Sequence, residues 1–146
     1  MKKLFFRSIA IFALVTLLIS CSKDDNNPSI VGKWKSTKQG VLVNNTIEWT
    51  DVTVYPCGEG FVNILSNNTF NTSNYYDFGT GCQEINTSGT WSQDGNIITI
   101  NSTHSDGTIE SQKIKSYSLT NSVWVIENIN QNTLESTGEY TQLNKI

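Results

Sequence analysis

The sequence beyond residue 20 lacks three common residue types, because it contains no alanine, no methionine and no arginine. Alanine and methionine favour helices, whereas the threonine, isoleucine, valine, tyrosine and tryptophan residues that crowd this chain fit the pleated surface of a sheet. The absence of arginine, together with a net charge of −3 for the whole chain, disfavours phosphate recognition. The composition therefore predicts an all-β protein that does not bind nucleic acid.

Residues that catalyse reactions or bind metals are few and scattered. His104 is the only histidine, and its neighbours Ser105 and Asp106 are typical of an exposed turn rather than of a catalytic triad, which needs a buried acid. Two of the carboxylates could face each other as a glycosidase pair, but Glu135 and Glu139 fit a wet outer surface better. No carboxylate run has calcium-loop spacing, and no histidine–cysteine set suits zinc. We therefore expect no enzymatic activity, no catalytic residues, no metal and no cofactor.

The first 20 residues have the order of a secretory signal peptide. A basic start with Lys2, Lys3 and Arg7 is followed by an apolar segment, residues 9–18. A transmembrane helix over residues 4–19 is the alternative, but this stretch of about sixteen residues contains Arg7 and Ser8 and is shorter than the roughly twenty that a span needs. We therefore expect residues 1–20 to form a signal-peptide helix that is removed on export.

The residues at the end of this segment indicate how the exported chain is held. Leu18-Ile19-Ser20-Cys21 resembles the bacterial lipobox, in which the peptide is cleaved before the cysteine and the thiol is joined to diacylglycerol. The resemblance implies a lipoprotein anchored to the outer membrane through acyl chains, palmitate among them, at Cys21. Loss of residues 1–20 removes three basic residues and no acidic one, so the net charge changes from −3 to −6.

A tether follows the lipidated cysteine. Residues 21–29 are polar and charged and include Pro28, as is typical of flexible linkers. Cys21-Ser22-Lys23-Asp24-Asp25 also resembles the surface-export signal of Bacteroidetes lipoproteins, in which lysine and paired acids follow the cysteine. A spacer that is acidic by chance is the alternative. Residues 30–146 then have the length of one domain.

Turn residues divide this domain into eight or nine predicted strands. Asp94-Gly95 and Asp106-Gly107 are the strongest hairpin signals, because such pairs adopt the positive φ angles of tight turns. A slip in the alternation at Thr50-Asp51 predicts a bulge. Short connections predict an up-and-down antiparallel barrel, with a flattened sandwich as the alternative. The predicted strands cover residues 33–43, 46–55, 61–65, 69–74, 88–93, 96–102, 108–119, 123–129 and 133–143.

Several segments of the domain resemble the small lipocalin-like lipoproteins of Bacteroidetes. Gly32-Lys33-Trp34 has the Gly-x-Trp pattern with which the first strand of lipocalin-like domains enters the barrel. Gly89-Thr90-Trp91, the run from Asp94 to Ile100, and Tyr117-Ser118-Leu119-Thr120 are similar to later segments. The resemblance implies a lipocalin-like barrel of about eight strands. Many lipocalins pack an arginine over the motif tryptophan; here either Lys145 takes that place through a cation–π contact or the barrel is closed differently.

Two cysteines remain once Cys21 is lipidated. Cys57 and Cys82 can pair only with each other, and export to an oxidising compartment permits the bond. Such a disulfide would stabilise the fold by about 3 kcal/mol. A redox or metal pair is the alternative, but the chain has no Cys-x-x-Cys motif and no histidine near either cysteine.

Two classes of function remain open. In the first, the barrel holds a small apolar or amphipathic ligand, as the lipocalin resemblance implies. In the second, large side chains fill the barrel, and Tyr75-Tyr76-Asp77-Phe78 forms the binding loop of a surface module for a protein or glycan partner. The alternative for this segment is that Tyr75 and Phe78 continue the fourth strand and pack inward. We expect a monomer in both. The candidate ligand-binding residues are Trp34, Trp49, Phe61, Trp91, Tyr117 and Trp124, and with Phe70, Ile98 and Ile100 they form the predicted interior.

Overall fold

The computed structural model describes residues 28–53, 57–77, 79–103 and 107–146. The expected signal peptide, Cys21, most of the tether, Phe78 and the turn with His104 lie outside the described residues. Every regular element within the described ranges is a strand, and no helix there could cross a bilayer. The strands are β1 (Gly32–Val43), β2 (Thr46–Asp51), β3 (Phe61–Ile64), β4 (Thr69–Asp77), β5 (Cys82–Asp94), β6 (Ile97–Thr103), β7 (Ile109–Leu119), β8 (Val123–Ile129) and β9 (Ser136–Lys145).

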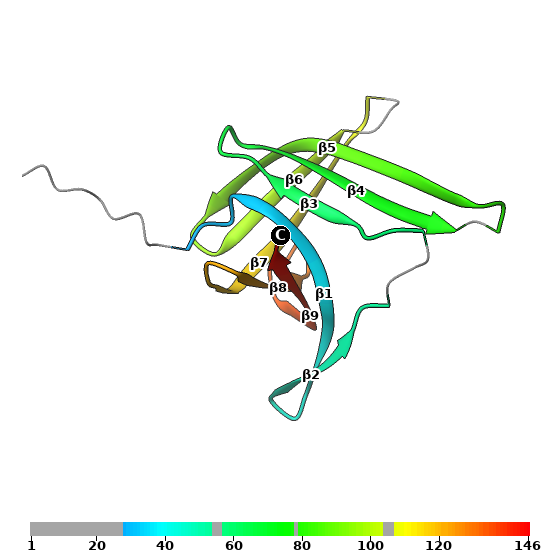
Figure 1. The fold of residues 1–146 in the computed structure, drawn as a ribbon. Helices are drawn as coiled ribbons and strands as arrows, with labels where there is room; N and C mark the ends of the chain where they lie inside the picture. Colours follow the sequence, from blue (N-terminus) through cyan, green and yellow to red (C-terminus); the bar gives the residue numbers. More distant parts are fainter. Residues whose placement is uncertain (1–27, 54–56, 78, 104–106) are drawn as a thin grey trace, which may run out of the picture.

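Eight of these strands close into an antiparallel barrel (Figure 1). Neighbours follow chain order from β3 to β9, and β1 closes the ring because it pairs with both β3 and β9. The remaining strand, β2, pairs with the second half of β1. The structure thus confirms the all-β up-and-down barrel and excludes the flattened sandwich.

The turn residues position the hairpins. Asn44-Asn45 joins β1 to β2, and both residues have positive φ angles, 49° and 63°, as a tight two-residue hairpin loop requires. The Asp94-Gly95 hairpin is confirmed with a shift of one residue. Asp94 pairs with Ile97, so Gly95 and Asn96 are the central residues, and of these two Gly95 has the positive φ, 59°.

Four strand boundaries differ from the prediction by three residues or more, and one of them is the end of β2, which lies at Asp51 instead of residue 55. β4 continues to Asp77 and therefore includes Tyr75 and Tyr76, so the binding loop is wrong for these two residues and the alternative, in which Tyr75 continues the fourth strand, is confirmed. β5 begins at Cys82 instead of residue 88, and β9 begins at Ser136 instead of residue 133. The first residues of β5 are exposed, so no apolar alternation marks them in the sequence. Together β4 and β5 form a long hairpin that extends beyond the rest of the barrel (Figure 1).

The predicted bulge at Thr50-Asp51 is wrong. β1 and β2 pair without a shift from Lys38 opposite Asp51 to Val43 opposite Thr46, and the alternation slips there because β2 ends. The register shifts lie elsewhere, at Ser36/Lys38, Ser116/Ser118 and Glu127/Ile129.

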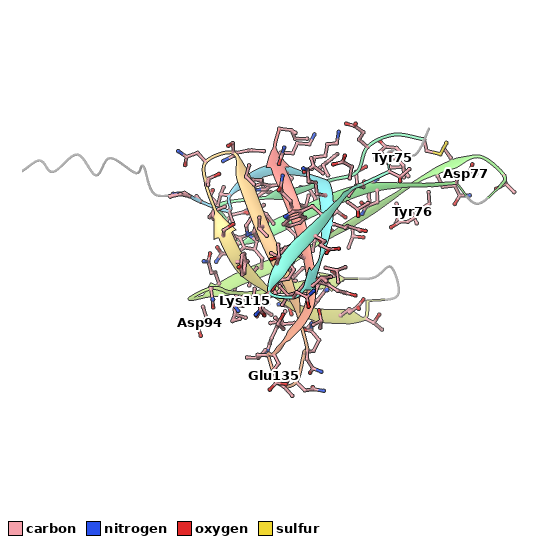
Figure 2. The ribbon with its side chains drawn as sticks, turned by 90° about the horizontal axis from the view of Figure 1, so that it is seen from below. Tyr75, Tyr76, Asp77, Asp94, Lys115 and Glu135 are labelled. Atoms are coloured by element: carbon pink, nitrogen blue, oxygen red, sulfur yellow. A yellow bond between two sulfur atoms is a disulfide. The ribbon has the colours of Figure 1, made fainter. Side chains whose placement is uncertain are left out.

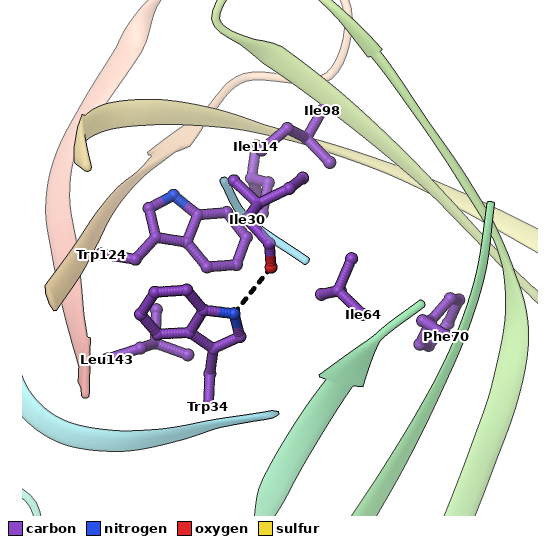
Figure 3. Packing of buried hydrophobic residues seen from close by; sticks show 8 residues of the cluster. All are labelled: Ile30, Trp34, Ile64, Phe70, Ile98, Ile114, Trp124 and Leu143. Atoms are coloured by element: carbon purple, nitrogen blue, oxygen red, sulfur yellow. Dashed lines mark hydrogen bonds between the residues drawn. The ribbon is translucent and has the colours of Figure 1, made fainter. Parts of the chain in front are cut away.

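The hydrophobic core fills one end of the barrel, here called the closed end (Figure 3). Six of its residues come from the starts of β1, β4, β6 and β8 and the ends of β3 and β9, which lie together in an antiparallel barrel; Ile114 comes from the middle of β7 and Ile30 from the residues before β1. The indole rings of Trp34 and Trp124 meet edge to face with their centroids 5.7 Å apart, a favoured geometry for aromatic pairs. The buried cluster comprises Ile30, Trp34, Ile64, Phe70, Ile98, Ile114, Trp124 and Leu143.

Trp34 also contacts residues near both termini of the domain at the closed end. Its Nε1–H donates a hydrogen bond of 2.7 Å to the carbonyl of Ile30, which holds the segment before β1 under the barrel. The Lys145 ammonium lies 5.3 Å from the centre of the Trp34 ring, which is within cation–π range. The predicted contact between Lys145 and the motif tryptophan is therefore confirmed.

Candidate functional site

The barrel wall is interrupted where β1 parts from β3. These strands share three residue pairs, from Gly32 opposite Ile64 to Trp34 opposite Val62. From Lys38 onward β1 pairs with β2 on that edge, while β9 pairs with the opposite edge of β1 from Trp34 to Val41. The interruption contains a cleft of about 440 Å³, within the range of roughly 300–1,000 Å³ that small-molecule sites occupy.

The cleft has an apolar base and mixed walls. Trp34 and Leu143 connect the base to the buried core, so the base is backed by rigid packing. β1 and β4 contribute hydroxyl and amide side chains, and the connection between β2 and β3 contributes its described ends. The residues that line the cleft are Trp34, Lys35, Ser36, Gln39, Val52, Thr53, Gly58, Glu59, Gly60, Phe61, Val62, Thr72, Asn74, Tyr75, Tyr76 and Leu143.

Two glycines allow the residues before β3 to lie against β4. A Cβ atom at Gly58 would stand 3.1 Å from the Tyr75 ring, and its φ of 132° is one that side chains disfavour. A Cβ atom at Gly60 would stand 2.6 Å from Asn74 Oδ1. A side chain at Gly58 would therefore crowd the Tyr75 ring in a disfavoured backbone conformation, and one at Gly60 would displace the Asn74 amide.

The predicted disulfide is confirmed and fixes the same wall. Cys57 is bonded to Cys82, and Cys82 pairs with Asp77 at the end of β4. Figure 2 shows the bond beside Tyr75 and Asp77. Because Cys57 directly precedes Gly58, the bond holds one cleft wall to the β4–β5 hairpin.

One ion pair lies at the cleft. The Lys35 ammonium contacts the Glu59 carboxylate, and these side chains are 25% and 51% exposed. Of the described residues that line the cleft, Glu59 is the single carboxylate, so the described part of the site provides no glycosidase pair. No group of three or more histidine, cysteine or acidic residues that could hold a metal is found within the described ranges.

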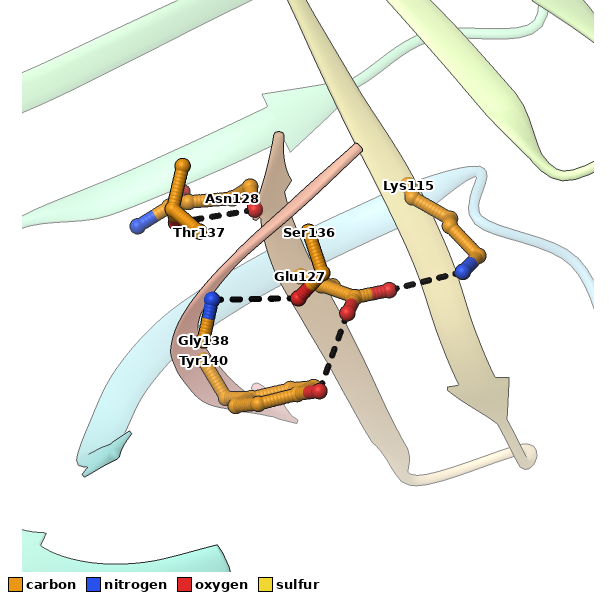
Figure 4. Close-up of polar contacts among 7 residues, drawn as sticks. All are labelled: Lys115, Glu127, Asn128, Ser136, Thr137, Gly138 and Tyr140. Carbon is orange, nitrogen blue, oxygen red and sulfur yellow. Dashed lines mark hydrogen bonds and ion pairs between the residues drawn. The ribbon is translucent and has the colours of Figure 1, made fainter. Parts of the chain in front are cut away.

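Sequence reasoning missed a buried polar group on the outer face of β7, β8 and β9 (Figure 4). The Glu127 side chain is 4% exposed, and its Oε2 lies 2.8 Å from the ammonium of Lys115. The Tyr140 hydroxyl donates a hydrogen bond of 2.9 Å to Glu127 Oε1. A single acid within the apolar run of residues 123–129 was the available signal.

Glu127 and Lys115 on this outer face each stabilise the charged form of the other. Burial raises the pKa of Glu127, but the hydrogen bonds from Lys115, Ser136 and Tyr140 outweigh burial and lower the pKa below its ordinary value of 4.5. The hydrogen bond to Glu127 raises the pKa of Lys115 above 10.5. Both groups are therefore ionised at neutral pH, and the ion pair links β7 to β8.

The structure separates the six candidate ligand-binding residues. Trp34 and Phe61 line the cleft. Trp124 is buried in the core and Trp91 packs against it, as expected for the interior, but neither lines the cleft. Phe70 and Ile98 are also buried in the core, and Ile100 packs against it, so these interior predictions are confirmed.

Two of the interior predictions are wrong. Tyr117 is 55% exposed and packs edge to face against Tyr140, with ring centroids 5.2 Å apart, because the register shift beside it turns it outward. Trp49 belongs to β2, which lies outside the ring of eight strands, and pairs with Gly40. The polar cleft residues on β1 and β4 were not predicted, because they line one cleft only where the pairing between β1 and β3 ends.

The closed ring of eight up-and-down strands, with Gly-x-Trp at the start of the first, defines a lipocalin-like barrel. A lipocalin-like protein from Bacteroides uniformis ATCC 8492 has a similar structure, with a TM-score of 0.52 and 17% identity over 80% of this chain and 97% of that chain. An uncharacterized protein from Bacteroides eggerthii DSM 20697 is also similar, with a TM-score of 0.50 and 13% identity over 81% of this chain and 100% of that chain. No family model matches the sequence, and no curated protein matches it significantly.

Proposed function

We propose that this protein is a non-enzymatic, lipid-anchored binding protein of the bacterial outer membrane that holds a small amphipathic ligand in the cleft. The observation that carries the proposal is the cleft of about 440 Å³, with an apolar base and polar walls, beside a core that is already filled. Such a combination of apolar surface with a few polar groups is typical of ligand sites. The lipocalin-like fold supports the same class of function.

The filled core determines where the ligand binds. Trp34 and Trp124 are 0% and 2% exposed, so their rings occupy the closed end where a ligand on the barrel axis would lie. An apolar chain therefore enters through the wall and rests on Phe61, Val62 and Leu143. A polar head group then faces the hydroxyl and amide groups of the cleft walls.

The anchor is supported by the lipobox resemblance and by the path of the chain. Ile30 is buried at the closed end, whereas Pro28 and Ser29 before it are exposed, so the last two residues of the expected tether are accessible at the closed end. Labelling of cells with a palmitate analogue should mark the wild type and not Cys21→Ser. Label on the variant would refute the anchor at Cys21, and resistance of the labelled wild type to protease added to whole cells would refute surface exposure.

Ligand binding is tested with the chain from Ser22 to Ile146, which keeps every strand and the whole core. Titration with the neutral dye N-phenyl-1-naphthylamine should give saturable, one-site fluorescence. Thr72→Trp fills the cleft and should abolish the signal. Ser92→Trp adds the same ring at an exposed position of β5 outside the cleft and should leave it intact. No saturable signal from the folded wild type, or equal signals from both variants, would contradict the proposal.

A surface interaction module is the second candidate function. It is favoured by three consecutive apolar residues, Val41, Leu42 and Val43, that are exposed beside the turn between β1 and β2, because exposed apolar patches often mark interfaces. In this case Val41→Ser with Val43→Ser should abolish cross-linking to a surface protein or glycan while dye binding stays unchanged. Unchanged cross-linking in this variant would remove the candidate.

A further inference from the structure

The charges of the cleft balance each other. Of the described residues that line it, Lys35 and Glu59 are the two charged ones, and their side chains are in contact. Lys35 comes from β1 and Glu59 from the residues between Cys57 and β3. Because opposite charges in contact largely cancel at longer range, these lining residues present no net charge to an entering ligand.

Two further lysines lie close by but outside the lining. The Lys33 ammonium stands 3.8 Å from the centre of the Phe61 ring, and the Lys145 ammonium lies over Trp34. Each cation is thus held against an aromatic ring instead of facing the cleft. Neither residue lines the cavity.

The other polar groups of the cleft are hydroxyls and amides. Ser36, Thr53 and Thr72 carry hydroxyls, and Gln39 and Asn74 carry amides. Such groups both donate and accept hydrogen bonds, which suits an uncharged head group with hydroxyls or amides of its own. A carboxylate would compete with Glu59 for Lys35, and an ammonium would compete with Lys35 for Glu59. A charged head that found no partner would lose its hydration without compensation.

We propose that the cleft selects amphipathic ligands with an uncharged, hydroxyl- or amide-bearing head group, and that this selectivity depends on the balance of charge between Lys35 and Glu59. The inference rests on the proposed function, because it assumes that the cleft binds a ligand. It adds the chemical class of the ligand and the residues that discriminate against charged analogues.

Three amphiphiles with the same eight-carbon chain test the ligand class. Octyl glucoside, nonanoate and octylamine carry a neutral, an anionic and a cationic head, and each is used below its micelle concentration to displace bound N-phenyl-1-naphthylamine from the chain Ser22–Ile146. We expect octyl glucoside to displace the dye at the lowest concentration. Equal or better displacement by either ion, or no displacement by any of the three, would overturn the inference while dye binding still supports the proposed function. Absence of dye binding would refute both.

Single-charge variants test the role of the ion pair. Glu59→Gln leaves Lys35 unpaired and should strengthen nonanoate binding about threefold while weakening octylamine binding, the size expected for a partly exposed ion pair. Lys35→Gln should do the reverse. The double variant, Lys35→Gln with Glu59→Gln, restores neutrality and should restore the wild-type ranking.

A matched control separates the local effect from net charge. Glu135→Gln removes one exposed carboxylate outside the cleft, and Figure 2 shows Glu135 well away from Tyr75 and Tyr76. This variant should bind all three amphiphiles as the wild type does. Equal shifts in Glu59→Gln and Glu135→Gln, or no shift in either cleft variant with both folded by circular dichroism, would show that selectivity does not depend on this balance of charge.

Discussion

The closed end and the cleft are adjacent along β1, yet they differ in burial, packing and polarity. At the start of β1, Trp34 is buried against Trp124 and Leu143. Two residues further along, Ser36 borders a cleft of about 440 Å³. The difference arises because β9 accompanies β1 through both regions whereas β3 leaves after three pairs.

This contrast separates stability from recognition. The closed end buries large apolar side chains and dominates the free energy of folding. The cleft leaves polar groups and aromatic rings accessible, and the packed base holds them in place. A filled lipocalin-like barrel can therefore still offer a binding site, provided that the site lies in the wall and not on the axis. Substitutions at the closed end should mainly lower the free energy of unfolding, whereas substitutions in the cleft should mainly lower ligand affinity.

The largest fall in the free energy of unfolding is expected from loss of packing at the closed end. Trp34→Ala removes a fully buried ring and its hydrogen bond to Ile30, and should lower the free energy of unfolding by about 3–5 kcal/mol. Urea denaturation followed by circular dichroism measures this change. A cost below about 1 kcal/mol would mean that the closed end does not dominate folding.

Loss of the disulfide should affect both properties. Cys57→Ser with Cys82→Ser should lower the free energy of unfolding by about 3 kcal/mol, since the bond closes a loop with a sequence separation of 25. Because Cys57 holds the wall that carries Gly58 and Glu59, dye affinity should fall as well, at a temperature where the variant is folded. Undiminished affinity would show that the wall keeps its place without the bond, and an unchanged melting temperature would refute its contribution to stability.

A third variant alters stability without touching the cleft. Glu127→Gln weakens the pair with Lys115 on the outer face and should cost about 1–2 kcal/mol at neutral pH, a modest figure because Lys115 is 34% exposed. Dye binding should not change. A loss of dye affinity would show that the outer face affects the cleft and would contradict the conclusion that stability and ligand binding depend on different regions.

The same group predicts a pH dependence. The pKa of Glu127 is lowered from 4.5, so its contribution is fully present above that value and is lost as pH falls through the lower folded-state pKa. Urea midpoints measured from neutral pH to below 4.5 should fall more steeply for the wild type than for Glu127→Gln. Parallel curves would contradict the assigned ionisation.

The smallest effect on stability is expected within the cleft wall. Asn74→Ala removes a half-buried amide that borders the cleft, and should change the free energy of unfolding by less than about 1 kcal/mol. Loss of one hydrogen bond should weaken octyl glucoside binding by about fivefold. Tyr117→Ser, on the outer face, is the matched control and should leave binding unchanged. Equal weakening in both variants would contradict the position of the site.

The sequence predicted the barrel well because its signals are local. Asn44-Asn45 and Gly95 determine turns through backbone conformation, and the apolar residues of β6 and the apolar run of β8 mark these strands as part of the core. The first half of β5 gave no such signal, because Gln83, Glu84 and their neighbours are exposed in the strand. The disulfide followed from counting cysteines.

The site could not be predicted in the same way. Tyr117 and Trp49 look like core residues in a linear pattern, but a register shift and the position of β2 outside the ring place them elsewhere. The cleft arises because β2 and β3 share one edge of β1, which is a feature of the tertiary pairing. Ser36 and Asn74 are far apart in sequence and line the same cleft only as a result of that pairing.

The most direct test is a map of ligand-induced changes across the molecule. Two-dimensional ¹⁵N–¹H spectra of the chain Ser22–Ile146, recorded during titration with octyl glucoside, report on every backbone amide. We predict saturable shifts at Ser36, Asn74 and Tyr76, with the amides of Ile98, Ile114 and Trp124 unchanged. Shifts centred on the closed end, or no saturable shift anywhere, would contradict binding in the wall of a filled barrel.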